Sequence, residues 1–370
     1  MFRLLRLAFI LPLCFTAPLL NAQQPAFKDR LYFEAFTHYG FVMPHIKEIA
    51  YFIDDHVKGF QFNIGIHSNG EKKWQSYYNY PRLGIGFYHS GLGNNDVYGQ
   101  VNALYGYFDR YFFGMNRRFN LGNRLAFGVS YINKKFDLQD NYFDIAIGSH
   151  INVYINYSLE GMVKVSPKMQ LKLGLGMTHL SNGRFKEPNK GLNLITSFAG
   201  LQYSLSDPSK LILPEPKEND EPGNNQMIVM GAIGEKQISR KYDYSYLPTA
   251  LSVEYARKLS RTSWVGIAFT TYYDPSLKKE IEMAGDTAKN GDNIRMALNI
   301  SYELKMGRFS SVFQPGIYVK NAYTKPGNIC NRIGIRYQLN RQWLAGITIK
   351  AHWFAIADFI EFGVGYRWHY

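Results

Sequence analysis

The last fifteen residues of the chain, "IADFIEFGVGYRWHY" (356–370), decide the fold because their two sets of alternate positions differ in polarity. Counting from Ile356, every even position is apolar or aromatic except Asp358. The odd positions include Glu361 and Arg367 among small residues. A β-strand points successive side chains to opposite faces, so this segment predicts a strand with one apolar and one mixed face. In a soluble sandwich the apolar face would point inward, whereas in a transmembrane β-barrel it would face lipid.

Composition favours the barrel. Aromatic residues make up 16% of the chain, with 28 Tyr and 26 Phe, and there are 33 Gly. This is typical of aromatic girdles and of tightly curved strands. Beyond the first twenty residues no apolar run is long enough for a transmembrane helix. The terminal aromatic residue also resembles the sorting signal of bacterial outer-membrane proteins. The sequence therefore predicts an all-β protein, an antiparallel transmembrane β-barrel of the outer membrane with an even number of strands.

Sixteen segments of about ten residues alternate in polarity, so we predict sixteen strands, with a range of 12–16. The predicted strands are 31–43, 58–67, 81–91, 96–110, 124–136, 149–163, 168–181, 192–205, 226–237, 247–258, 262–273, 291–304, 308–319, 328–339, 342–352 and 356–370. Short connections, such as 165–167, alternate with longer ones, such as 275–290, as in outer-membrane barrels. The long Pro-rich segment 206–225 disagrees with this pattern. It is either a periplasmic excursion or the seam between two substructures.

The start of the chain has the pattern of a secretory signal. Two arginines precede an apolar run at 7–20, which is followed by Asn-Ala at residues 21–22. We therefore expect a signal peptide at 1–22, cleaved on export. After the signal peptide, we expect the first half of the barrel at 23–205, a Pro-rich connection at 206–225 and the second half of the barrel at 226–370.

The charge of the chain suggests anionic partners. The formal net charge is +13, which falls to about +11 once the two arginines of the leader are removed. Such a balance favours phosphate-bearing partners, and export makes lipid headgroups a better candidate than nucleic acid. The nine His residues are scattered, and no Gly-rich nucleotide loop precedes a helix. We expect neither a metal nor another cofactor.

One polar stretch, "THLSNGRFKEPNKGLN" (178–193), stands out at the end of a predicted strand. His179 and Ser181 continue the odd-numbered apolar row of that strand and therefore point to the outer wall. Residues two apart on one face lie about 7 Å apart at the backbone, close enough for an imidazole to reach a hydroxyl. Asn193 lies on the outer face of the returning strand. The alternative is that these residues only begin a polar loop above the hydrocarbon.

Two other His–Ser pairs in the chain lack this spacing. His67–Ser68 and His89–Ser90 are adjacent in sequence, so the two side chains of each pair point to opposite faces of a strand. We predict that neither pair interacts directly.

The run His179-Leu180-Ser181-Asn182, followed by 188–191 (Pro-Asn-Lys-Gly), resembles the active-site signature of the lipid A 3-O-deacylases (PagL) and their acyloxyacyl-hydrolase-like relatives. Members of this family are outer-membrane β-barrels whose catalytic His and Ser lie on the outer wall. Typical members are small eight-stranded barrels, so the resemblance leaves the second half of this chain unexplained.

The resemblance implies ester hydrolysis, with Ser181 as nucleophile and His179 as general base and then acid. Better-known members carry a glutamate where this chain has Asn193. Replacing the carboxylate of a serine-protease triad lowers turnover by about 10⁴, yet cysteine-protease triads use Asn in this role. Glu187 is a second candidate for the missing carboxylate.

The resemblance also implies roles for the loop that follows the motif. Candidate oxyanion donors are Asn182, Asn189 and the backbone amides near Gly183. Candidate ligands for lipid A phosphates are Arg184, Lys186 and Lys190; the alternative for these three is a basic solvated loop.

The sequence therefore predicts an outer-membrane serine esterase that removes an ester-linked acyl chain from lipid A, with lipopolysaccharide and outer-membrane lipids as partners. One alternative is a pore or transporter, because a sixteen-stranded barrel is wide enough for an aqueous channel. Another is an inactive relative that binds lipopolysaccharide.

Overall fold

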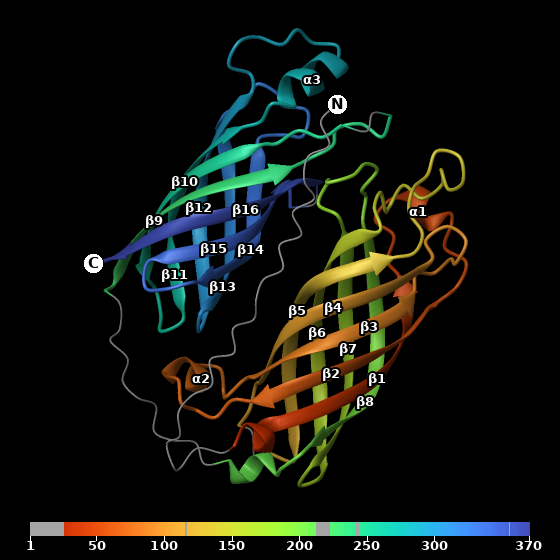
Figure 1. Cartoon of the computed structure of the whole chain (residues 1–370), viewed down its shortest axis with the longest axis vertical. Coiled ribbons are helices and arrows are strands. Elements are labelled where there is room, and N and C mark those ends of the chain that lie inside the picture. Colours follow the sequence, from red (N-terminus) through yellow and green to blue (C-terminus); the bar gives the residue numbers. More distant parts are fainter. Residues whose placement is uncertain (1–25, 115–116, 212–222, 242–243, 355) are drawn as a thin grey trace, which may run out of the picture.

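The sixteen strands close into two separate eight-stranded antiparallel barrels (Figure 1). The computed structural model describes residues 26–114, 117–211, 223–241, 244–354 and 356–370. The predicted signal peptide, 1–22, lies outside these ranges, as does most of the Pro-rich connection. The structure confirms the predicted fold class and strand number. It differs from the expectation of one continuous barrel, because two sheets close independently.

The first barrel contains eight strands: β1 (Leu31–Val42), β2 (Val57–His67), β3 (Arg82–Gly91), β4 (Gln100–Tyr111), β5 (Phe119–Ile132), β6 (Ile151–Ser166), β7 (Met169–Ser181) and β8 (Leu192–Ser204). The second contains β9 (Asn225–Glu235), β10 (Thr249–Lys258), β11 (Ser263–Tyr273), β12 (Ile294–Met306), β13 (Phe309–Lys320), β14 (Ile329–Gln338), β15 (Trp343–His352) and β16 (Ile356–His369). Short helices lie outside the strands: η1 (Phe27–Arg30), α1 (Lys47–Ala50), α2 (Lys73–Tyr77), η2 (Pro208–Lys210) and α3 (Leu277–Met283).

The segment 206–225 is the seam between the two barrels. β8 pairs back with β1, and β16 pairs with β9, so no strand pairing joins the barrels across this segment. Alternation within a strand reports which face is buried but not which strand closes the sheet. For that reason the sequence left both readings of 206–225 open.

Alternation correctly predicts which side chains face outward. On β7, Leu173 and Leu175 are 55% and 61% exposed, while Lys172, which precedes Leu173, is fully buried. On β16, Phe362 and Val364 are exposed on the outer wall and Glu361 is buried. In a membrane-spanning barrel, this exposed apolar row meets lipid.

The pattern fails at one place on β16, where Asp358 turns into the lumen. Lys350 pairs with Phe359 while Ala351 pairs with Ala357, so Asp358 is an extra residue in the ladder. Such a β-bulge lets two neighbouring side chains point the same way. Both Asp358 and Phe359 are buried as a result.

Both lumens are filled by charged side chains rather than open. In the first barrel Arg124 and Lys172 contact Glu34 at 2.7 and 2.8 Å, and Arg82 contacts Asp109 at 2.6 Å. All of these side chains are buried.

The second barrel is filled in the same way. Arg332 pairs with Glu361 at 2.7 Å, and Arg336 pairs with Glu254 at 2.6 Å. Eight strands leave an interior that side chains can fill, so the wide channel of the pore alternative loses its premise. Across the described ranges, no helix is long and apolar enough to cross a membrane.

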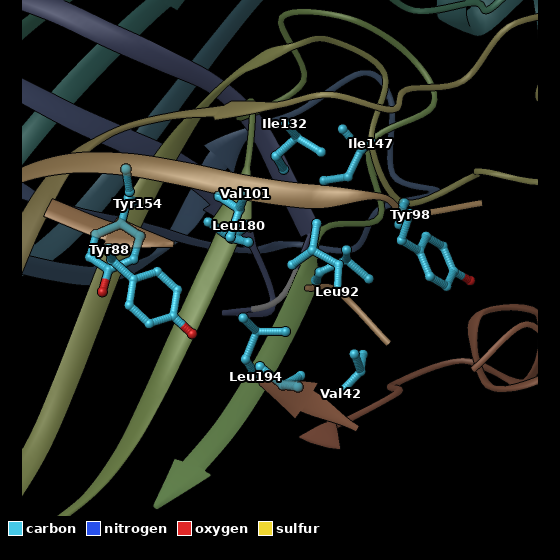
Figure 2. Close-up of a cluster of buried hydrophobic side chains, with 14 of the residues drawn as sticks. Val42, Tyr88, Leu92, Tyr98, Val101, Ile132, Ile147, Tyr154, Leu180 and Leu194 are labelled. Atoms are coloured by element: carbon cyan, nitrogen blue, oxygen red, sulfur yellow. The ribbon is translucent and has the colours of Figure 1, made fainter. Parts of the chain in front are cut away.

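An apolar cluster closes the loop end of the first barrel (Figure 2). It includes Leu180 from β7 and Leu194 from β8, together with Leu92 and Ile147 from the loops. All four are fully buried. Leu180 lies between His179 and Ser181 in the sequence, so its inward anchoring fixes those two side chains on the outer wall.

Candidate active site

His179, Ser181 and Asn193 form one hydrogen-bonded chain at the loop end of the first barrel. His179 and Asn193 are direct cross-strand partners on β7 and β8. The distance from His179 Nδ1 to Asn193 Oδ1 is 2.8 Å, and that from His179 Nε2 to Ser181 Oγ is 3.0 Å. The structure thus brings together the three residues that the sequence singled out, on the face that alternation predicts.

The Asn193 oxygen determines which imidazole nitrogen carries the proton. An amide oxygen can only accept a hydrogen bond, so Nδ1–H of His179 must be the donor in that pair. Nε2 then presents its lone pair to the Ser181 hydroxyl. This is the tautomer in which a histidine can take a proton from a serine nucleophile.

The loops of the first barrel cover the site. Ser181 is only 5% exposed although it lies on the outer wall. Gly191 (φ +75°) lies directly against the pair, and a Cβ at this position would be 3.1 Å from His179 Cε1. Its N–H donates to Ala146 O at 2.9 Å, which ties the site to the loop between β5 and β6.

Asp144 shapes that covering loop. Its Oδ1 accepts hydrogen bonds from the N–H groups of Ala146 and Ile147 at 3.1 and 3.0 Å, while its Oδ2 is buried without a hydrogen-bond partner. Burial raises the pKa of Asp144 to about 7. Sequence reasoning missed Asp144 because no spacing relates it to the motif. Gly191 was part of the motif, but only the structure shows that it contacts the imidazole.

The two asparagines predicted as oxyanion donors differ in their surroundings. Asn182 donates from Nδ2 to Ser149 Oγ and to Lys186 O, both at 3.0 Å, so its amide group holds the loop together. Asn189 Oδ1 accepts the backbone N–H of Asn182 at 2.9 Å. That bond places the Asn189 amide beside the residue that follows Ser181.

The remaining loop residues predicted for the site lie toward the second barrel or toward solvent. Gly183 (φ +62°) packs so closely against Ile360 that a Cβ at position 183 would come within 2.4 Å of that side chain. The Arg184 guanidinium is paired with the carboxylates of Glu187, Glu280 and Asp358. Lys186 is half-buried and Lys190 is exposed.

The sequence-adjacent His–Ser pairs behave as predicted. Ser90 is buried in the lumen, whereas His89 faces outward, where its Nδ1 lies 3.0 Å from Asn102 Oδ1. This outer-wall His–Asn pair has no serine two residues on, since position 91 is glycine. His67 points into the lumen, 3.2 Å from Ser204 Oγ rather than toward Ser68. Of the residues that the structure describes, no group of three or more His, Cys, Asp or Glu is arranged to hold a metal.

Fold and site together define an outer-membrane β-barrel protein with a Ser–His–Asn chain on its wall. Comparison of the sequence with family models gives two matches. The model for lipid A 3-O-deacylase (PagL) matches residues 58–202, which include the whole motif. The model for the acyloxyacyl hydrolase C-terminal domain matches residues 225–370, the second barrel. The chain therefore belongs to the lipid A 3-O-deacylase (PagL) and acyloxyacyl-hydrolase-like family of the bacterial outer membrane.

Solved structures with similarity to the chain include two outer-membrane barrels. The outer membrane enzyme PagL aligns with 16% identity and a TM-score of 0.30, covering 45% of this chain and 97% of PagL. Neisserial surface protein A (NspA) aligns with 13% identity and a TM-score of 0.31, covering 47% of this chain and 96% of NspA. No curated protein matches the chain.

Proposed function

We propose that the protein is an outer-membrane serine esterase that hydrolyses an ester-linked acyl chain of lipid A. The proposal rests on one observation. On the outer wall, His179 is hydrogen-bonded to Asn193 at 2.8 Å through Nδ1 and to Ser181 at 3.0 Å through Nε2. Membership in the lipid A 3-O-deacylase family supports the choice of substrate.

In the proposed reaction Ser181 Oγ attacks the acyl carbonyl carbon while its proton passes to His179 Nε2. The tetrahedral oxyanion forms beside Gly183 and the Asn189 amide, whose N–H groups can stabilise it; the Asn182 N–H already donates to Asn189 Oδ1. The proton on His179 then moves to the leaving sugar oxygen. Water attacks the acyl-Ser181 ester by the reverse sequence and releases the fatty acid and the free serine.

The location of the site suits a lipid substrate. The outward positions beside the site include Val153, Ile155 and Ile195, so an acyl chain in the bilayer can approach the site along an apolar stretch of the barrel wall. Among the cationic residues of the loop, Lys190 is exposed and is the best placed to meet a phosphate group.

Mass spectrometry of lipid A from cells that express the protein tests the proposal. Wild type should remove one hydroxyacyl chain, and Ser181→Ala should leave lipid A intact. Ser90→Ala is the matched control, because Ser90 also follows a histidine but is buried in the lumen. Unchanged lipid A with folded wild-type protein in the outer membrane would refute the substrate assignment.

Export through a cleaved leader is a second part of the proposal. The pattern at 1–22 predicts a mature chain that begins at Gln23. Intact-mass measurement of the protein purified from outer membranes tests this directly. A mass that includes residues 1–22 would contradict it.

A further inference from the structure

The loop that carries the candidate oxyanion donors, 182–191, is held by the second barrel as well as by the first. Arg184 leaves the first barrel and meets two carboxylates of the second. Its Nη2 lies 3.0 Å from Glu280 Oε1 in α3, and its Nη1 lies 3.5 Å from Asp358 Oδ1 in β16. The third nitrogen, Nε, lies 2.8 Å from Glu187 Oε1 within the loop. Each nitrogen of the guanidinium thus faces a carboxylate.

The acidic partners belong to the buried end of the second barrel. The side chains of Glu280 and Asp358 are 8% and 1% exposed, and Lys236 contacts both at 3.3 and 2.9 Å. Asp358 reaches this position only because of the β-bulge in β16. Removing one partner of an ion pair with so little access to water leaves the other charge uncompensated.

Backbone contacts fix the same loop at two further points. The N–H of Gln237, which follows β9, donates to Arg184 O at 3.0 Å, and the N–H of Glu187 donates to Gln237 Oε1 at 2.9 Å. Gly183 lies flat against Ile360 of β16. These contacts lie within six residues of Ser181, on the segment that carries the candidate oxyanion donors.

We propose that the second barrel is a positioning element for the catalytic loop of the first, and that Arg184 is the positioning residue that connects them. This inference rests on the proposed esterase function and deepens it. It assigns a role to residues 225–370 and an alternative role to Arg184, which the sequence suggested as a phosphate ligand. Displacing catalytic groups by about 1 Å can cost about a hundredfold in rate, so a loop anchored in this way affects turnover more than substrate affinity.

Steady-state kinetics with two esters distinguish positioning from phosphate binding. The substrates are lipid A and a phosphate-free p-nitrophenyl acyl ester. Arg184→Ala should lower kcat on both by about tenfold to a hundredfold with little change in KM, and Arg184→Lys should restore part of the loss. A phosphate ligand would instead raise KM for lipid A alone.

Glu280→Gln sharpens the comparison. It weakens the anchor while leaving Arg184 in place, so positioning predicts a smaller loss of kcat in the same direction. Phosphate binding predicts no loss, because Arg184 would be freed from a competing carboxylate. Glu282→Gln is the control, since Glu282 also lies in α3 but pairs with Lys279 on the exposed face of the helix. Heat-modifiability on gels confirms that each variant is folded.

A spin label separates failure of this inference from failure of the esterase assignment. The label is placed at Phe185→Cys, an exposed loop position, in a Cys330→Ser background. Arg184→Ala and Glu280→Gln should each increase the mobility of the label. If the two variants increase the mobility of the label but the wild type has no esterase activity, the anchor is supported and only the proposed reaction is refuted. Unchanged mobility would overturn the inference, and so would a mobile loop with unchanged kcat.

Discussion

Replacing Asn193 with aspartate is expected to raise turnover, because it gives His179 a charged partner in an unchanged position. Aspartate has the shape of asparagine, so its carboxylate can occupy the place of Oδ1, 2.8 Å from His179 Nδ1. An amide can present either its oxygen or its NH₂ group, whereas a carboxylate can only accept. The substitution therefore fixes the imidazole tautomer and stabilises the imidazolium that forms during the reaction.

The size of the effect follows from the strength of that hydrogen bond. A neutral hydrogen bond contributes about 0.5–1.5 kcal/mol and one to a charged group about 1.5–3 kcal/mol. The midpoints of these ranges differ by about 1.2 kcal/mol, which corresponds to about an eightfold increase in kcat. Asn193→Ala should lower kcat about tenfold to a hundredfold, since it removes the acceptor and leaves Nδ1–H unpaired in a half-buried site.

The assay is steady-state hydrolysis of a p-nitrophenyl acyl ester by purified, detergent-solubilised protein. Asn102→Asp is the matched control, because Asn102 makes the same cross-strand contact with His89 on the outer wall but no serine completes it. If Asn193→Asp and Asn193→Ala both leave kcat within about twofold of wild type, Asn193 does not orient the histidine and the reasoning fails.

Three further predictions concern the support of the site and the fold. Gly191→Ala should lower kcat about tenfold to a hundredfold in a folded barrel, because the new Cβ would press on His179 Cε1 at 3.1 Å; full activity would contradict the contact. The raised pKa of Asp144, about 7 against an ordinary value of 3.8, means that the folded state binds this proton more tightly than the unfolded state. Stability should therefore fall as pH rises from about 4 to 7, by at most about 4 kcal/mol, and Asp144→Asn should flatten this dependence in urea titrations; equal slopes would refute it. Lys172→Met should destabilise the first barrel by about 3–5 kcal/mol in urea unfolding, since Arg82 and Arg124 alone then face the carboxylates of Glu34, Asp109 and Glu160 and one buried negative charge is left uncompensated; a loss under 1 kcal/mol would contradict that account.

Strand positions could be predicted from the sequence because each strand carries its own evidence. Burial of one face and lipid exposure of the other impose a period of two, which is visible in any ten-residue window. All sixteen strands were found in this way, with the largest displacement at β5, which begins at Phe119 rather than at 124. Phe119 and Leu121 extend the outward-facing apolar row to positions before the predicted start at 124. Arg117 and Arg118 directly precede them and obscure the alternation in the sequence.

Closure into two barrels could not be predicted by the same reasoning. Which strand pairs with β1 depends on curvature and shear summed over the whole sheet, and no single window contains that information. The bulge at Asp358 was hidden for a related reason. In the sequence, an aspartate in an apolar row looks like a local exception. In the structure it marks the inserted residue of a β-bulge, and its carboxylate pairs with Lys236 in the lumen.

The candidate site was predictable where it depends on two adjacent strands. The His179, Ser181 and Asn193 side chains share one face of a hairpin, so register alone places them together. The partners of Arg184 were not predictable, because Glu280 and Asp358 lie in the other barrel, far away in the sequence. Asp144 was missed because it is linked to the site only through Ala146, whose N–H donates to Asp144 Oδ1 and whose carbonyl oxygen accepts from Gly191 N–H.

The most direct test of the central claim is to trap the acyl-enzyme on Ser181. Purified protein is mixed with lipid A in H₂¹⁸O and quenched with acid within the first turnover, and its peptides are then analysed by mass spectrometry. The account predicts a hydroxyacyl ester on Ser181 in the wild type and ¹⁸O in the released fatty acid. Fatty acid release that persists in Ser181→Ala, with no acyl group on the wild-type peptide, would contradict it.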